Sequence, residues 1–485
     1  MNRDITRKEF LEISGGSVAA LALGATMAQG AVTGNNPITI ENAKPGSTAW
    51  EPTNQAQNRE IEGYADKTSL KAGEQIKFYV NTASASYKID IYRLGWYGGA
   101  GARLYRSVSR TGVRQVIPTP NVTTGLVECK WKSPYTLTLP TGTAAWTSGI
   151  YLAKLTTKEG KQSHIPFVIR DDTRFVNHLM QASVNTWQAY NNWGGKSLYD
   201  YNSTGGKRAS KVSFNRPYSA YGSGDLYNDW SGWELNTLRF LEREGYDVSY
   251  CTNIDTHANP NLFARCRSFI SCGHDEYWSY ELRNNIEWER NQGHHIAFLG
   301  ANAAYWQVRF ESGFDNAPYR TMVCYKDAAQ DPYYQNPTTR DLTTIRWRDL
   351  EADRPEGEFI GVQFYYYPVN ADMVVKNTNH WVFAGTGLQD NDRLPGLVGY
   401  EADSIMERTP LNATILADSP VDTGDTQGFS NMIAWQHSGG AWVFATGSMQ
   451  FAWGLDSHFA GWSHPNLVHP AAQQILRNVL ARFSV

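Results

Sequence analysis

The sequence lacks features that define three common classes of protein. The apolar stretch near the N-terminus is too short to span a bilayer, and no run after it approaches the roughly eighteen apolar residues of a transmembrane helix, so no membrane span is predicted. Its 44 Lys and Arg against 47 Asp and Glu give a net charge of −3, which argues against a nucleic-acid partner. With 41% hydrophobic and 19% charged residues, the composition excludes a disordered or fibrous chain.

Cysteine is scarce. The five residues are an odd number and too sparse for a disulfide framework, and the sequence leaves their pairing open: Cys129, Cys251, Cys266, Cys272 and Cys324. No CxxC motif or Cys/His cluster has the spacing of a zinc site. Aromatic residues are in excess instead, at 13% of 485 residues. This surplus requires an explanation, either in packing or in ligand stacking.

Residues 1–31 are predicted to be a signal peptide. Basic residues precede an apolar stretch, and small residues that suit cleavage follow it. The start, with Arg7 and Lys8, is similar to a twin-arginine signal in which the second Arg has become Lys; an ordinary secretory signal is the alternative. A twin-arginine signal implies export of a folded protein, so we expect a periplasmic or secreted location. The polar residues 32–58 are predicted to be a linker or extended arm.

Residues 59–172 are predicted to form an all-β, immunoglobulin-like sandwich. Ile76, Phe78 and Val80 alternate with polar residues, as on the buried face of a strand. The turn at 158–161 joins two further apolar segments as a hairpin. Short strands without a helical pattern favour a sandwich.

Residues 173–485 show an α/β pattern. A strand at 267–272, a helix from Ser279 to about Gln292 and a strand at 295–299 predict a βαβ unit, whose strands are parallel. Further predicted elements are strands at 176–184 and 247–251, helices at 233–244 and 471–483, and a hairpin over 430–446. Beyond about residue 315 the chain mixes loops with aromatic strands.

Three polar segments follow predicted strands of this sheet. They are residues 185–195, 273–276 and 300–302, and they are rich in His, Glu, Asn and Tyr. The carboxyl ends of parallel strands share one edge, where open α/β folds bind ligands. We therefore expect these segments to meet in one site.

Together the motifs resemble the large (beta) subunit of N,N-dimethylformamidase, from about Phe175 to near the C-terminus. The resemblance rests on Gly273-His274-Asp275-Glu276-Tyr277-Trp278, Gly300-Ala301-Asn302 with Tyr305-Trp306, Thr186-Trp187-Gln188-Ala189-Tyr190-Asn191, Phe214-Asn215-Arg216-Pro217-Tyr218 and Gly399-Tyr400-Glu401. The core of that subunit is similar to class I glutamine amidotransferases. The resemblance thus implies an amidotransferase-like, open and mostly parallel sheet.

The resemblance also implies one ferric iron (Fe3+) per chain, held by two tyrosinates and a glutamate, in an enzyme that hydrolyses a small amide. Glu276 would be the carboxylate ligand and Tyr190 one phenolate. Tyr218 is the predicted second phenolate, with Tyr221 and Tyr227 as competitors. A hard cation prefers such anionic oxygen donors.

Three further residues are predicted to be catalytic. His274 and Asn302 would donate hydrogen bonds to the oxygen that becomes charged in the tetrahedral intermediate. Glu401 would take the proton of water and pass it to the leaving amine. Cys272 is a poor candidate for an amidotransferase-type nucleophile, because it precedes the loop and lacks a Gly-x-Cys-x-Gly turn.

Each candidate also has a purely structural interpretation. Glu276 could cap the helix that begins near Ser279, where acids favour the helix dipole. Tyr190 lies near Trp187 and Trp193 in sequence and could serve in packing or ligand stacking. His274, Tyr218, Asn302 and Glu401 could likewise be structural.

The sequence therefore predicts an exported, iron-dependent hydrolase of an amide or related C–N bond. The alternative is a glycan-binding or glycan-active surface protein that uses exposed aromatics, such as those of the loop at 95–99. Family members that act on dimethylformamide have a separate small subunit and a longer large subunit, so the substrate stays open. A small-molecule amide or a glycan is the expected ligand, and a homo-oligomer is left open.

Overall fold

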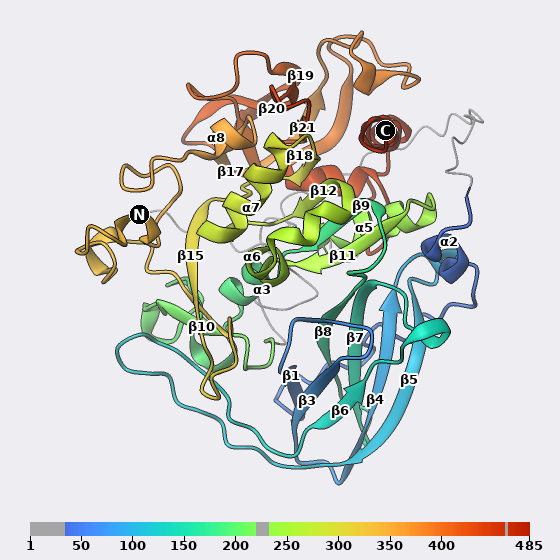
Figure 1. The fold of residues 1–485 in the computed structure, drawn as a ribbon, viewed down its shortest axis with the longest axis vertical. Coiled ribbons are helices and arrows are strands. Elements are labelled where there is room, and N and C mark those ends of the chain that lie inside the picture. Colours follow the sequence, from blue (N-terminus) through green and yellow to red (C-terminus); the bar gives the residue numbers. More distant parts are fainter. Residues whose placement is uncertain (1–33, 220–231, 461–463) are drawn as a thin grey trace.

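A computed structural model describes residues 34–219, 232–460 and 464–485. The predicted signal peptide, Tyr221 and Tyr227 lie outside the described residues. Figure 1 shows two parts, an N-terminal pair of sheets and a larger part built around a central sheet. Among the described residues, no helix has the length and apolar character needed to cross a membrane.

The N-terminal part has two sheets packed face to face. One has the order β1 (Ile61–Ala65), β3 (Gln75–Thr82), β6 (Tyr135–Thr138); the other has the order β2 (Ser69–Lys71), β8 (Gln162–Arg170), β7 (Gly149–Thr157), β4 (Ser86–Leu94), β5 (Ala102–Thr111). Ile76, Phe78 and Val80 lie on the buried face of β3, as their alternation predicts. The turn at 158–161 joins β7 and β8, which pair antiparallel. We call residues 59–172 the sandwich; the boundaries and the immunoglobulin-like comparison stay predictions.

The segment predicted to be a linker or extended arm is in part helical. Pro37–Asn42 forms helix α2, which Asn36 caps by accepting hydrogen bonds from the backbone of Ile38 and Thr39. Trp50 is completely buried. The capping box and Pro at the first turn are local helix signals that outweigh the polar composition of the segment.

The central sheet has seven strands in the order β11 (Val248–Thr252), β9 (Val176–Ala182), β12 (Cys266–Gly273), β14 (His295–Gly300), β21 (Trp442–Ala445), β20 (Gln427–Gln436), β19 (Thr414–Asp422). The first five pair in parallel, β20 is antiparallel to β21, and β19 is antiparallel to β20. Helix α7 (Tyr280–Asn291) connects the parallel neighbours β12 and β14, so the predicted βαβ unit is confirmed. In the described residues of this part, the other α-helices are α3 (Val184–Tyr190), α5 (Leu235–Arg243), α6 (Asn253–Ala258), α8 (Glu356–Phe359) and α9 (Pro470–Phe483).

The long connection between β14 and β21 makes the molecule β-rich. It forms β15 (Trp306–Glu311), β16 (Thr321–Val323), β17 (Gln363–Val374) and β18 (Arg393–Ser404). Strands β17 and β18 pair with each other, while β10 (Lys211–Ser213), β16, β15 and β13 (Tyr277–Ser279) form a small sheet. Aromatic and β-branched residues favour strands here, as at Tyr365 to Tyr367 in β17. The structure shows mixed sheets with few helices; the amidotransferase-like comparison stays a prediction.

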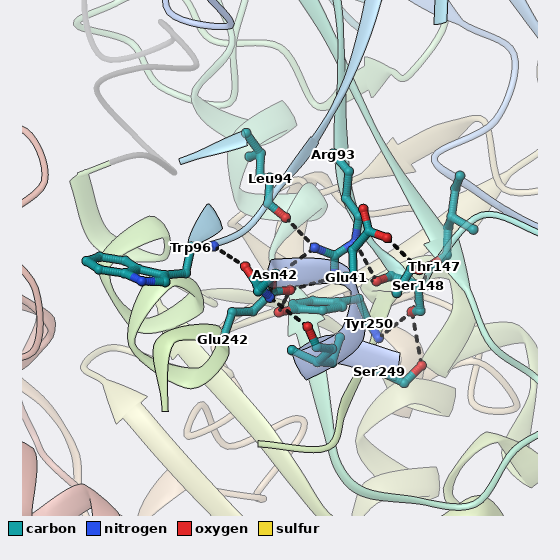
Figure 2. Close-up of polar contacts among 12 residues, drawn as sticks. Glu41, Asn42, Arg93, Leu94, Trp96, Thr147, Ser148, Glu242, Ser249 and Tyr250 are labelled. Atoms are coloured by element: carbon teal, nitrogen blue, oxygen red, sulfur yellow. Dashed lines mark hydrogen bonds and ion pairs between the residues drawn. The ribbon is translucent and has the colours of Figure 1, made fainter. Parts of the chain in front are cut away.

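A buried ion pair joins the sandwich to the central part. Figure 2 shows Arg93 of β4 against Glu242 of α5, with nitrogen to oxygen distances of 2.6 and 2.9 Å. Both side chains are fully inaccessible to solvent. Glu242 also accepts hydrogen bonds from the Tyr250 hydroxyl and the Asn42 amide, at 2.8 Å each. Because β4, α2, α5 and β11 all contribute, the two parts form one packed unit.

The loop that suggested sugar stacking lies in this interface. Its Trp96 ring lies 4.9 Å from the guanidinium of Arg239 and 5.6 Å from that of Arg243, both on α5. The backbone nitrogens of Trp96 and Tyr97 donate to the Asn42 side chain, and Tyr97 is buried. Packing therefore accounts for the aromatic residues of this loop.

Candidate active site

The predicted loops meet at the carboxyl edge of the parallel strands. Tyr190 ends α3, which follows β9; Glu276 lies in the loop after β12; Asn302 lies in the loop after β14. Backbone nitrogens of residues 304 to 306 donate to the carbonyls of Asp275 and Glu276, which ties the second and third loops together. The meeting of these segments, predicted from strand order, is confirmed.

Glu276 is the centre of the cluster. Its Oε2 accepts a hydrogen bond from the Tyr190 hydroxyl at 3.0 Å, and the Tyr199 hydroxyl lies 3.0 Å from both carboxylate oxygens. The Tyr190 and Tyr199 rings stack with their centroids 4.3 Å apart. Helix α7 is capped by the Ser279 hydroxyl, which accepts from the Leu282 nitrogen. The carboxylate of Glu276 thus contacts tyrosines instead of capping the helix.

Tyr199, which was not predicted, is the second tyrosine that contacts Glu276; Tyr218 as a metal ligand stays a prediction. Among the described residues, no hydrogen bond joins Tyr218 to Glu276; burial raises the pKa of Tyr218, and the charged groups that act on it are Arg216, Arg320 and Glu234. The sequence did contain a signal for Tyr199. Gly194 and Gly195 have φ angles of 78° and 87°, a left-handed conformation that reverses the chain and returns Tyr199 to the end of α3.

Lys326 and Tyr277 extend the cluster behind Tyr199. Lys326 Nζ donates to the Tyr277 hydroxyl at 2.7 Å, and that hydroxyl donates to the Tyr199 hydroxyl at 2.6 Å. The ammonium also lies 3.5 Å from the Tyr199 ring centroid. Burial lowers the pKa of Lys326 to about 8, although the negative charge of Glu276 opposes the shift. Neither residue was predicted to be part of the site. Lys326 is distant in sequence, and only the tertiary structure brings it to this edge.

His274 links the two candidate carboxylates. Its Nε2 lies 3.3 Å from Glu276 Oε2 and 3.2 Å from Glu401 Oε2. Burial opposes a charged imidazole, but Glu401 and Glu276 together raise the pKa of His274 well above its ordinary value. Asn302 Nδ2 donates to Glu401 Oε2 at 2.8 Å. The structure thus brings His274, Asn302 and Glu401 together beside Glu276.

Comparison with known proteins identifies the family. A family model described as "N,N-dimethylformamidase beta subunit-like, C-terminal" matches residues 88–464, more than half of the chain. The chain belongs to the N,N-dimethylformamidase beta subunit-like family. The match begins in β4, so it includes much of the sandwich as well as every candidate site residue. Membership points to a dimethylformamidase-like hydrolase.

Other comparisons add little to this dimethylformamidase-like assignment. No curated protein matches the chain. Among solved structures, a cycloisomaltooligosaccharide glucanotransferase from Paenibacillus sp., complexed with cycloisomaltoheptaose, is similar at 10% identity and a TM-score of 0.16. The similarity covers 65% of this chain and 61% of the glucanotransferase, less than two thirds of its length.

The donors of this dimethylformamidase-like site fit a hard metal ion. In the described residues, no group of three or more His, Cys, Asp or Glu is arranged to hold a metal; the oxygen donors that meet at Glu276 are the phenols of Tyr190 and Tyr199. Burial, followed by the charge of Glu276, raises the pKa of both tyrosines well above the ordinary value. Without a cation the phenols are therefore protonated donors, whereas a hard cation could replace their protons.

The electrostatics of Glu276 favour its anionic form. Burial acts to raise its pKa, but the hydrogen bond and charge of His274, followed by the charge of Lys326, outweigh burial and lower it. The Asn302 Oδ1 atom is buried without a hydrogen-bond partner among the described residues. An anionic carboxylate and a buried amide oxygen without a partner in one cluster suit a site that receives a cation and a polar substrate.

Proposed function

We propose that the protein is an exported, metal-dependent hydrolase that cleaves an amide or related C–N bond. The observation that carries the proposal is the convergence of Tyr190 and Tyr199 on the buried carboxylate of Glu276. These three residues would hold one iron ion. When bound, ferric iron would supply a Lewis acid that polarises an amide carbonyl and makes water more acidic.

The remaining residues would handle charge and protons. His274 Nε2–H and Asn302 Nδ2–H would donate to the carbonyl oxygen as it gains negative charge. Glu401 would accept a proton as the water oxygen bonds to the carbonyl carbon, and would return it to the nitrogen as the C–N bond breaks. The products would be a carboxylic acid and an amine.

Export is proposed from the sequence alone. The basic and apolar pattern of residues 1–31 supports it, and a twin-arginine route would allow metal to be acquired before export. We propose a periplasmic or secreted location. The family name makes N,N-dimethylformamide the first amide to test, without fixing the natural substrate.

Metal analysis and visible spectroscopy test the metal centre. We expect about one iron per chain and a tyrosinate-to-iron charge-transfer band. Glu276→Gln should lose the iron, and Tyr199→Phe should lose or shift the band. Tyr218→Phe is the matched control, because among the described residues Tyr218 forms no hydrogen bond with Glu276, whereas Tyr190 and Tyr199 do. A protein that stays colourless after ferric reconstitution, or a band that depends on Tyr218 instead of Tyr199, would contradict the proposal.

A further inference from the structure

Asp275 lies between two residues of the candidate site but has contacts of a different kind. Its Oδ2 accepts hydrogen bonds from Gln181 Nε2 at 2.7 Å and from Ser271 Oγ at 2.9 Å. Its Oδ1 accepts one from Asn253 Nδ2 at 2.9 Å. The side chain is 1% exposed, and its partners come from β9, β12 and α6. It therefore binds the framework behind the site, whereas Glu276 faces the tyrosines.

The same network reaches the helix that carries Tyr190. Asn253 Oδ1 accepts a hydrogen bond from the backbone nitrogen of Asn185, near the start of α3, at 3.1 Å. Asn185 Nδ2 in turn donates to the Tyr277 carbonyl at 2.9 Å. One buried carboxylate thus connects α3 to the loop after β12. These two segments provide Tyr190 and Glu276.

A contribution to stability does not explain why a carboxylate is buried at position 275. Within the described residues, no Lys, Arg or His forms an ion pair with it, and its hydrogen bonds come from the neutral side chains of Gln181, Ser271 and Asn253. A buried carboxylate without a cation costs free energy compared with a well-packed apolar residue. Its hydrogen bonds do fix the relative positions of three elements, because Oδ2 accepts from β9 and β12 and Oδ1 accepts from α6.

We propose that Asp275 is a positioning residue that fixes the separation between the Tyr190 phenol and the Glu276 carboxylate, and hence the affinity of the site for metal. The inference rests on the proposed metal centre. Asp275 itself contacts neither metal nor substrate in this scheme. Outer residues that orient metal ligands typically change metal affinity by about 10- to 100-fold when mutated.

The test is ferric iron affinity, measured by competition with a chelator, together with the charge-transfer spectrum and the melting temperature. In Asp275→Asn the new amide nitrogen must face a donor, since both oxygens accept hydrogen bonds. We expect iron affinity to fall by about 10- to 100-fold and the band to shift. Asp456→Asn is the matched control, because Asp456 is also buried but accepts from Arg239 and Arg243. It should lower stability and leave iron affinity unchanged.

A second variant tests the hydrogen bond itself. In Asp275→Asn with Gln181→Glu, the new amide can donate to a carboxylate at position 181, which restores both one hydrogen bond and the buried charge. We expect this double variant to recover part of the lost affinity. If Asp275→Asn does not fold, Asn253→Ala cuts the connection to α3 while leaving the other two donors, and it should also weaken iron binding.

The outcomes separate this inference from the proposed function. Wild-type protein that takes up no iron overturns both. Iron uptake by wild type with an unchanged affinity and spectrum in folded Asp275→Asn overturns the inference alone. So does an equal loss of affinity in the Asp456→Asn control.

Discussion

At the residue scale, neighbours in sequence have opposite environments. Glu276 contacts two tyrosine hydroxyls and lies near the charges of His274 and Lys326, whereas the donors that Asp275 has among the described residues are neutral side chains. Both carboxylates are buried, yet the pKa of Glu276 is lowered and burial raises the pKa of Asp275. The difference arises because their side chains point to opposite sides of one loop.

A prediction at this scale concerns Cys272. The thiol is 1% exposed, and burial, followed by the charges of Glu234 and Asp275, raises its pKa well above the ordinary value. We expect Cys272→Ser to retain iron and its charge-transfer band, and the thiol of the folded protein to resist alkylation by iodoacetamide. Rapid labelling of Cys272 under native conditions, followed by mass spectrometry of peptides, would contradict this burial.

At the element scale, the contact between β4 and α5 holds the sandwich on the central part. Arg93 also donates to the carbonyls of Ser148 and Leu94, so its guanidinium is saturated with acceptors. Removing one partner of a buried ion pair leaves the other charge uncompensated. The pair therefore specifies how the elements dock.

Arg93→Met should lower the free energy of unfolding by about 3 to 5 kcal/mol. Guanidinium titration followed by tryptophan fluorescence would measure the loss. Arg408→Met is the control, because Arg408 pairs with Asp353 at the surface, where solvent screens the pair, and its loss should change the free energy of unfolding little. Equal losses in the two variants would show that the buried pair has no special role. Arg93→Met with Glu242→Leu should recover stability, since no charge is left unpaired.

The elements differ in how far the sequence predicted them. Helix α7 and strands β12 and β14 were predicted closely, because a Ser cap, an apolar period and Gly at the end of the helix agree locally. Strands β17 and β18 were not located, since their pairing spans register shifts that no local pattern encodes. Helix α2 was not predicted, because the polar composition of residues 32–58 indicated a linker despite the cap at Asn36.

At the scale of the whole molecule, one hydrophobic cluster extends through both parts. It includes Trp50, Leu94 and Leu152 of the N-terminal region together with Leu238 and Tyr250 of the central part. Among the described aromatics, Trp278, Trp347 and Trp453 are completely buried as well. Much of the aromatic surplus therefore serves packing, and the glycan interpretation stays a prediction without support from the loop at 95–99.

Buried histidines predict how the whole fold responds to acid. Burial lowers the pKa of His164 and of His178 from the ordinary value of 6.5 to about 3. Between these values the unfolded chain binds more protons than the folded one, so stability is lost as pH falls below about 6.5. Each histidine would contribute a slope of up to about 1.4 kcal/mol per pH unit.

Thermal unfolding between about pH 7 and pH 4 measures this loss. Carboxylates contribute in the same range, so the comparison is with His178→Gln, which cannot titrate. We expect that variant to lose less stability than wild type over the same pH interval. Parallel pH profiles for the two proteins would show that His178 titrates normally in the folded state.

The sequence by itself determined the parallel βαβ unit, the edge at which the polar loops meet, the family resemblance and the candidates Tyr190, Glu276, His274, Asn302 and Glu401. These follow from local periodicity and from motifs that lie directly after strands. Only the tertiary structure decided that Tyr199 is the second tyrosine on Glu276, that Lys326 lies behind it and that Asp275 faces the framework. The reason is physical: a side chain's neighbours depend on chain reversals and on strand pairing between distant segments, which residue spacing does not encode.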